Sequence, residues 1–383
     1  MQQNMIGAYG PWAAGLTAGR LPALSFRRDE FDDLEAWRAA ARQRVLERMA
    51  PPATAAPGQV ETIETGQYDG LAFERLRWRL PYGPATEAVV LKPLEASGPL
   101  PGVLALHCHG GRKCWGWKKV ARIADPPPPV RAHQERYYGG RAWANELAKR
   151  GYVVLAHDAF AFASRKVRMA DCHPAVRGQS EVVDPDPDDT AAEQVEAYDR
   201  FAAQHEHIMA KSLFCAGTTW PGVFWSEDRI ALDILARRQD VDAERLGCGG
   251  LSGGGLRTCL LAGLDERIAC AVAVGFMSTW KDFLLHKAHT HTWMLYIPLL
   301  PNELDFPEIL GLRAPAPTMV QNTTEDKLFT LDAVHESKRM LEAIFAKAGG
   351  PERLAFNLYP GPHKFDAAMQ EDAFEWFDRW LKR

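Results

Sequence analysis

The sequence lacks the long apolar segments and the excess of basic residues that mark membrane proteins and nucleic-acid-binding proteins. No apolar stretch in its 383 residues reaches the roughly 18 residues of a membrane span, and no basic start with a long apolar run opens the chain. The net charge of −4 gives no overall attraction to nucleic acid or to an anionic membrane surface. With 46% hydrophobic and 25% charged residues, we expect a cytoplasmic globular protein that acts on a small molecule.

Recognisable metal-binding motifs are also missing. The cysteines, seven and therefore odd in number, have no paired zinc-ligand spacing, so we expect free thiols in a reducing compartment. Other metal-ligating residues cluster at His107 and His109, at His286, His289 and His291, and at Asp184, Asp186 and Asp188. Neither His-Glu-x-x-His nor the glycine and distal glutamate of a calcium loop accompanies them. We expect no metal and no cofactor.

Short apolar runs that alternate with helical segments dominate the chain after its first hundred residues. The runs are "GVLAL", "YVVLA", "IACAVAV", "TMVQ" and "LAFNLY", and they predict a mostly parallel central sheet with helices on both faces. Two strand-like runs precede them, "LAFERLRWRL" and "EAVVLKPL". Residues 1–60 are expected to form an N-terminal extension with one helix around Asp32 to Arg48, and residues 61–383 the main domain. An insertion at about 159–224, with a helix from about Ala191 to Lys211, is expected to be a cap or a surface excursion.

The stretch "GCGGLSGGG", residues 247–255, concentrates glycine around one serine. Gly250 to Gly254 match Gly-x-Ser-x-Gly between a strand and a helix, the context of a nucleophile elbow. Glycine relieves the collisions of such a sharp turn and leaves the amide of Gly253 free to point at the group that Ser252 attacks. The alternative is a phosphate-binding or tightly packed turn, but Gly-x-Gly-x-x-Gly and Gly-Lys-Ser/Thr are both absent.

A serine nucleophile requires a histidine base and an acid that orients it, here in the order serine, acid, histidine. "PTMVQNTTEDKLF" is a strand followed by a loop that carries Asp326, and "LAFNLYPGPHKF" is a strand followed by a turn that carries His363. Ser252, Asp326 and His363 therefore all follow the carboxyl ends of strands, where open α/β sheets gather their ligands. Glu325 competes with Asp326 for the acid, and Asp326 is favoured.

"GVLALHCHGGRK" predicts a buried strand that runs into a loop at His109, Gly110 and Gly111. In this position a loop can supply a second backbone donor for an oxyanion, beside the amide of Gly253. The two glycines allow the backbone to approach a substrate closely.

Together, "GVLALHCHGGRK", "YYGGRAWANELAKRGYVVLAHDAFAFASR", "DRIALDIL", "VDAERLGCGGLSGGGLRT", "QNTTEDKLF" and "GPHKF" resemble the α/β-hydrolase superfamily, in its dienelactone hydrolase and acetylxylan-esterase-like branch. The resemblance covers about residues 60–383. It implies the α/β-hydrolase fold, Ser252 as nucleophile, Asp326 and His363 as its relay partners, and the amides of Gly253 and of the His109 to Gly111 loop as oxyanion donors. Dienelactone hydrolases carry a cysteine nucleophile where this chain has serine, which favours a carboxylic ester as substrate.

The substrate itself is less well defined by the sequence. Side chains near the predicted site that suit a sugar ring, an aromatic acyl group or an anionic substrate are Trp115, Lys118, Arg165, Trp225 and Met277. Lys119 can likewise attract an anion or lie in solvent. We expect hydrolysis of an acetylated carbohydrate or of a small aryl or alkyl ester. The alternatives are a peptidase of the prolyl-oligopeptidase type and a non-catalytic binding module. Homo-oligomer formation stays open.

Overall fold

A nine-stranded sheet forms the centre of the protein, as a computed structural model of residues 3–53, 58–95, 98–177, 181–186 and 191–382 describes it. The strands are β1 (Glu61–Tyr68), β2 (Leu71–Trp78), β3 (Thr86–Pro93), β4 (Leu100–Leu106), β5 (Val153–His157), β6 (Val241–Leu251), β7 (Ile268–Val274), β8 (Thr318–Thr323) and β9 (Leu354–Tyr359). Their order is β1-β2-β3-β5-β4-β6-β7-β8-β9. The pairs β1–β2, β2–β3 and β3–β5 are antiparallel and all others are parallel, so the sheet is mostly parallel, as predicted.

The burial of each strand explains whether it could be predicted from the sequence. Every residue of β5 and β8 is buried. β5 is a continuous apolar run before His157, whereas β8, "TMVQNT", also buries the polar side chains of Gln321 and Asn322. In contrast, β1 has no buried residue, because it is the edge strand and pairs only with β2. Its sequence "ETIETGQY" therefore carries no apolar alternation, and the sequence analysis did not predict it.

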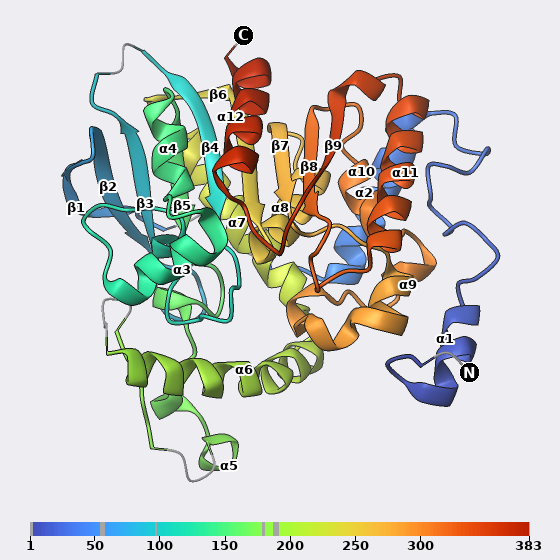
Figure 1. The fold of residues 1–383 in the computed structure, drawn as a ribbon, viewed down its shortest axis with the longest axis horizontal. Coiled ribbons are helices and arrows are strands. Elements are labelled where there is room, and N and C mark those ends of the chain that lie inside the picture. Colours follow the sequence, from blue (N-terminus) through green and yellow to red (C-terminus); the bar gives the residue numbers. More distant parts are fainter. Residues whose placement is uncertain (1–2, 54–57, 96–97, 178–180, 187–190, 383) are drawn as a thin grey trace.

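Helices cover both faces of the sheet (Figure 1). The helices are α1 (Gly10–Gly15), α2 (Leu34–Met49), α3 (Pro128–Tyr138), α4 (Trp143–Lys149), α5 (Pro174–Arg177), α6 (Ala192–Cys215), α7 (Trp220–Ala236), α8 (Gly253–Leu264), α9 (Trp280–Asp282), α10 (Phe306–Gly311), α11 (Leu331–Lys347) and α12 (Ala367–Leu381). The buried residues of α4 and α12 share one core cluster with one face of the sheet, and those of α2, α7, α8 and α10 share another. This layered arrangement places the functional loops at the carboxyl edge of the sheet.

The N-terminal segment joins the main core through α2. Asp33 caps this helix by accepting hydrogen bonds from two backbone N–H groups of its first turn. Trp37 stacks on Phe26, and its indole donates to the backbone oxygen of Leu24 at 2.7 Å. Because Val45 and Met49 are fully buried in the same cluster as the sheet, α2 packs as part of the domain core.

The predicted insertion contributes one long helix, α6, which crosses below the carboxyl edge of the sheet (Figure 1). Its buried face includes Tyr198, Asp199, Phe201 and Glu206. Two of these are carboxylates seven residues apart, and therefore on one side of the helix. They face the loop that follows β4, which makes α6 part of the surroundings of the predicted site.

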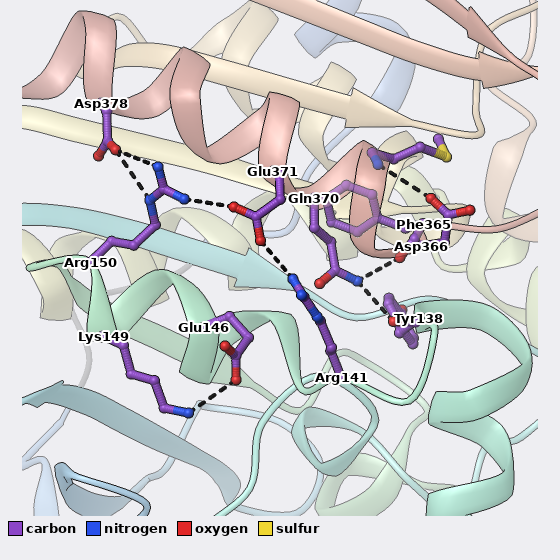
Figure 2. A network of polar contacts seen from close by, with 11 residues as sticks. Tyr138, Arg141, Glu146, Lys149, Arg150, Phe365, Asp366, Gln370, Glu371 and Asp378 are labelled. Carbon is purple, nitrogen blue, oxygen red and sulfur yellow. Dashed lines mark hydrogen bonds and ion pairs between the residues drawn. The ribbon is translucent and has the colours of Figure 1, made fainter.

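The C-terminal helix α12 is fixed to α4 and to the end of α3 by the polar network in Figure 2. Arg150 binds Glu371 at 2.8 Å and Asp378 at 3.0 Å, and Arg141 also binds Glu371. The buried amide of Gln370 donates to the backbone oxygens of Tyr138 and Phe365 at 2.9 and 2.6 Å. These bonds hold the segment just before α12, which includes the turn with His363.

The described residues contain no group of three or more His, Cys, Asp or Glu side chains placed to hold a metal ion. Asp188, one of the three clustered aspartates, lies outside them. All seven cysteines are free, and five of them are buried. None of the helices in the described ranges combines the length and the apolar character needed to cross a membrane.

Candidate active site

Ser252 lies in a strained turn between β6 and α8. Its backbone angles are φ 60° and ψ −118°, a combination that a residue with a side chain rarely adopts. The turn is held closed, since the N–H of Ser252 donates to the backbone oxygen of Val274 at 2.8 Å. A Cβ on Gly250 or Gly254 would lie 2.2 or 2.1 Å from the carbonyl oxygen of Leu106. Both glycines are therefore required by the close approach of the turn to β4.

His363 and Asp326 form a hydrogen-bonded pair beside this turn. Nδ1 of His363 lies 2.6 Å from Oδ2 of Asp326, whose side chain is only 2% exposed. Oδ1 of Asp326 accepts from the N–H of Leu328 at 2.9 Å, which fixes the carboxylate. Because Nδ1 faces the carboxylate, Nε2 is the ring nitrogen of His363 that remains available for another partner. This atom is buried and has no hydrogen bond to any described residue. Glu325, the competing acid, is exposed and does not bond to His363.

The position of the His363 ring depends on its neighbours. A Cβ on Gly275, which has φ +59°, would lie 2.9 Å from Cε1 of the imidazole. The ring of Tyr137 meets the imidazole edge-on at 6.4 Å between centroids. The N–H of Phe365 donates to the backbone oxygen of Tyr137 at 2.7 Å, which ties the histidine turn to the end of α3.

Residues 107–114 form a loop after β4 that packs against the serine turn. We call it the oxyanion loop, after the role that the sequence predicts for it. A Cβ on Gly253 would lie 3.0 Å from the backbone nitrogen of His109. The N–H groups of Gly253 and His109 donate to no described residue. Gly110 and Gly111 have φ of 57° and 68°, left-handed values that let the loop turn sharply here. Two unpaired backbone donors therefore lie side by side next to Ser252.

Helix α6 binds the oxyanion loop through two carboxylates, Asp199 and Glu206. Asp199 accepts hydrogen bonds from the N–H groups of Lys113 and Cys114 at 2.7 and 3.1 Å. Glu206 binds Nε2 of His109 at 3.0 Å and Nζ of Lys113 at 2.7 Å. Burial lowers the pKa of His109, and the N–H of Gly111 donates to its Nδ1 at 3.0 Å. His109 is therefore neutral, with its proton on Nε2 toward Glu206.

Two further histidines, His107 in the loop and His133 beside it, are held by neighbouring atoms rather than free to bind a metal. Nδ1 of His107 lies 3.0 Å from the backbone oxygen of Cys108, and its Nε2 accepts from the N–H of Ala159 at 3.2 Å. Burial lowers the pKa of His133 to about 2, and its Nε2 lies 3.3 Å from the sulfur of Cys108. Both rings are therefore neutral parts of the packing around the loop.

One cavity of about 550 Å³ connects these parts. Ser252, Asp326 and His363 line it, together with Gly253 and with His109, Gly110 and Gly111. The structure thus brings together the seven residues that the sequence placed at the nucleophile, its partners and the oxyanion donors.

The five predicted substrate-binding residues, Trp115, Lys118, Arg165, Trp225 and Met277, do not line this cavity. Trp115 and Lys118 border a separate cavity of about 260 Å³ beside Asp158. Arg165 is buried in an ion pair of 2.6 Å with Glu227, and Trp225 and Met277 belong to the hydrophobic core. The side chains of Arg165, Trp225 and Met277 are thus used for charge compensation and packing, which sequence proximity to the site could not distinguish from substrate contact.

Other residues that the sequence analysis did not predict form the cavity wall. They are Cys108, Arg136, Tyr137, Leu256, Phe276, Thr290, His291, Thr292, Met294, Leu295, Lys327, Leu328 and Pro362. Several come from the stretch "THTWML", which forms short irregular turns and so gives no periodic signal. Burial lowers the pKa of His291 to about 4, so this ring is neutral in the wall. The wall is mainly apolar, with cations at Arg136 and Lys327 and the carboxylate of Glu325 among its exposed residues.

No protein-family model matches the sequence. The chain is 25% identical over 347 residues to the protein named Putative hydrolase YtaP of Bacillus subtilis (strain 168). That alignment covers 90% of this chain and all of the relative.

Solved structures with the same fold include several esterases. A putative acetyl xylan esterase from Bacteroides fragilis NCTC 9343 superposes with a TM-score of 0.68 at 18% identity, over 93% of this chain and 83% of that protein. A glucuronoyl esterase from Solibacter usitatus superposes with a TM-score of 0.59 at 14% identity, over 94% of this chain and 97% of that protein. Together with the sheet order and the strand-turn-helix at Ser252, these similarities show that the chain has the α/β-hydrolase fold.

Proposed function

We propose that this protein is a serine esterase that hydrolyses a carboxylic ester through an acyl-enzyme intermediate. The observation that carries the proposal is the 2.6 Å pair of His363 and Asp326 in the cavity that also contains the strained Ser252. The esterase names of the structural relatives and the hydrolase name of the sequence relative support the same reaction class.

In the proposed reaction, Ser252 attacks the ester carbonyl while Nε2 of His363 takes its proton. Asp326 keeps the proton on Nδ1 and stabilises the imidazolium that forms. The N–H groups of Gly253 and His109 receive the oxyanion, which in such sites lowers the barrier by about 3 kcal/mol per donor. His363 then protonates the leaving alcohol and afterwards activates water, which releases the acid and restores Ser252. No cofactor takes part in this sequence.

The cavity supports a small ester rather than a polymeric chain bound along its length. Its volume of about 550 Å³ suits a substrate of drug size or smaller. The apolar wall formed by Leu256, Phe276 and Met294 favours an apolar acyl or alcohol group on one side of the ester. An acetylated carbohydrate or a small aryl or alkyl ester fits these features, and the cations at Arg136 and Lys327 lie where a substrate would meet solvent.

The proposal is tested by labelling with a fluorophosphonate probe and by hydrolysis of 4-nitrophenyl acetate. We expect the probe to modify Ser252, and we expect Ser252→Ala to lose labelling and turnover without a change in melting temperature. Ser337→Ala is the matched control, because Ser337 is buried in α11 and donates only to the backbone of Ala333. Folded protein that is neither labelled nor active would support the non-catalytic binding module instead. A panel of acetylated sugars, aryl esters, lactones and prolyl peptides then separates an esterase from a peptidase.

A further inference from the structure

Lys119 is a buried lysine that lies behind the oxyanion loop. Its side chain is 0% exposed, and its Nζ donates to the backbone oxygens of Cys108 and His109, both at 2.9 Å. The ring of Phe162 lies 4.6 Å from Nζ. Within the described ranges, no carboxylate forms an ion pair with it, although Asp158 and Asp199 act on it from farther away. Keeping an ammonium group charged in such a place is costly, and burial lowers its pKa to about 8.

The two carbonyl groups that Lys119 binds belong to the peptide groups that supply the oxyanion donors. In a planar trans peptide, the C=O of one residue and the N–H of the next point in opposite directions. The C=O of Cys108 points to Lys119, so the N–H of His109 points away from it, toward the side where Gly253 and Ser252 lie. The C=O of His109 and the N–H of Gly110 are related in the same way. Lys119 therefore fixes the direction of the N–H groups of His109 and Gly110, two residues that line the cavity.

The positive charge of Lys119 beside these carbonyl oxygens also changes how strongly the N–H groups donate. Hydrogen bonds with an ionised donor are roughly twice as strong as neutral ones, and linked hydrogen bonds polarise one another. Electron density drawn toward Lys119 makes the N–H on the other side of each peptide group a stronger donor. A fixed, polarised donor is what stabilises an oxyanion more than it stabilises the neutral ester.

We propose that Lys119 is a positioning residue for ester hydrolysis, which orients and polarises the peptide groups of Cys108–His109 and His109–Gly110 toward the oxyanion. The proposal rests on the proposed function. Lys119 acts through the backbone, since it does not line the cavity and cannot touch a substrate. It is thus distinct from the anion-attracting role that its position in the sequence suggested. Phe162 supports it by packing on its ammonium group and on the ring of His109.

The experiment compares Lys119→Met with the wild-type protein and with Lys166→Met. Lys166 is also a buried lysine that donates to a backbone carbonyl, but that carbonyl belongs to Pro185, which lies outside the oxyanion loop and does not line the cavity. The measured quantities are kcat and KM for 4-nitrophenyl acetate and the inhibition constant of a trifluoromethyl ketone, which forms an oxyanion on the serine. We expect Lys119→Met to lower kcat by about 10- to 100-fold with KM nearly unchanged. This loss is smaller than the ~10²–10³-fold loss of kcat that follows the removal of a whole oxyanion-hole donor. The ketone should bind more weakly by a similar factor, and Lys166→Met should match the wild type.

The outcomes separate this inference from the proposed function. If the wild type hydrolyses the ester and folded Lys119→Met keeps its kcat, or changes KM alone, Lys119 does not position the oxyanion donors. If Lys119→Met does not fold, Lys119→Gln replaces it, since an amide keeps a donor but has no charge. A reduced kcat and weaker ketone binding in that variant support the inference, and wild-type values overturn it. If the wild type shows neither turnover nor probe labelling, the proposed function itself fails.

Discussion

Two glycines in α8 provide a direct test of how the serine turn positions the oxyanion loop. A Cβ on Gly254 would lie 2.1 Å from the carbonyl oxygen of Leu106, and a Cβ on Gly263 would lie 2.2 Å from that of Ile309. Both distances fall about 0.8 to 0.9 Å short of the 3.0 Å that real Cβ atoms need, and in both cases the obstacle is backbone. Gly254→Ala and Gly263→Ala therefore create equal overpacking in one helix. Such overpacking destabilises a protein by about 1–3 kcal/mol.

The two variants differ in what the displaced backbone carries. Leu106 is the last residue of β4, directly before the oxyanion loop, whereas Ile309 lies in α10 and does not line the cavity. A displacement of about 1 Å in a catalytic group can cost about 10²-fold in rate. We expect Gly254→Ala to lower kcat for 4-nitrophenyl acetate by about that factor and Gly263→Ala to keep a kcat close to wild type. Both should lose a few degrees in melting temperature.

The assay measures kcat and KM well below the lowest melting temperature, with thermal unfolding followed by circular dichroism. Gly15→Ala is the neutral control, because nothing lies within 4 Å of its added Cβ and Gly15 is at the end of the exposed helix α1. Equal losses of kcat in Gly254→Ala and Gly263→Ala would show that general destabilisation, and not the position of the loop, controls activity. A Gly254→Ala protein with wild-type stability and rate would refute the packing argument itself.

Three other predictions concern separate parts of the structure. Gly275→Ala should lower kcat by more than 10-fold and barely change KM, because the added Cβ would lie 2.9 Å from Cε1 of His363. Steady-state kinetics measures both constants, and an unchanged kcat would contradict the prediction. Arg165→Met should lower the free energy of unfolding in urea by about 3–5 kcal/mol, because it leaves Glu227 buried without the partner that it binds at 2.6 Å. The double variant with Glu227→Leu should recover most of this loss, and additive losses in the double variant would refute the ion pair as the cause. His291 has a folded pKa of about 4 against an ordinary value of 6.5, so between these pH values the unfolded chain binds the extra proton and stability falls as pH falls, by about 3 kcal/mol in all. His291→Phe should remove this part of the dependence in unfolding measured from pH 7 to pH 4, and parallel curves for both proteins would exclude His291 as its source.

The sheet and the serine turn could be predicted because their local sequence is constrained by the same forces that shape the fold. Strands such as β7, "IACAVAV", are buried on both sides and so consist of apolar or small residues. Gly250 and Gly254 are required by backbone contacts at about 2 Å, which no side chain could tolerate. Ser252, Asp326 and His363 each follow a predicted strand, which placed all three at the carboxyl edge of the sheet, and in the structure they line one cavity.

The cavity wall and the buried charges could not be predicted, because contacts distant in sequence determine them. Trp115 and Trp225 looked like substrate contacts from their position near the site, yet both are at least 90% buried in packed clusters. Phe276 and Met294 line the cavity from a stretch of short turns between β7 and β8, where no periodicity marks one face. Lys119 looks like a surface cation in "WGWKKV", yet it is buried among groups distant in sequence, the carbonyls of Cys108 and His109 and the ring of Phe162, 43 residues along.

The contacts of α6 limit how the cavity can open to a substrate. Asp199 and Glu206 bind His109, Lys113 and Cys114 of the oxyanion loop through four contacts between 2.7 and 3.1 Å, and the two of these that Asp199 makes go to backbone N–H groups. Movement of α6 as a free lid would break these bonds and leave Lys113 and Glu206 as buried charges without partners, at a cost of several kcal/mol. The access route is therefore expected on the side of Arg136 and Lys327, the exposed residues of the cavity wall, where no such bonds must break. In this arrangement we expect α6 to keep the loop in place while a substrate enters.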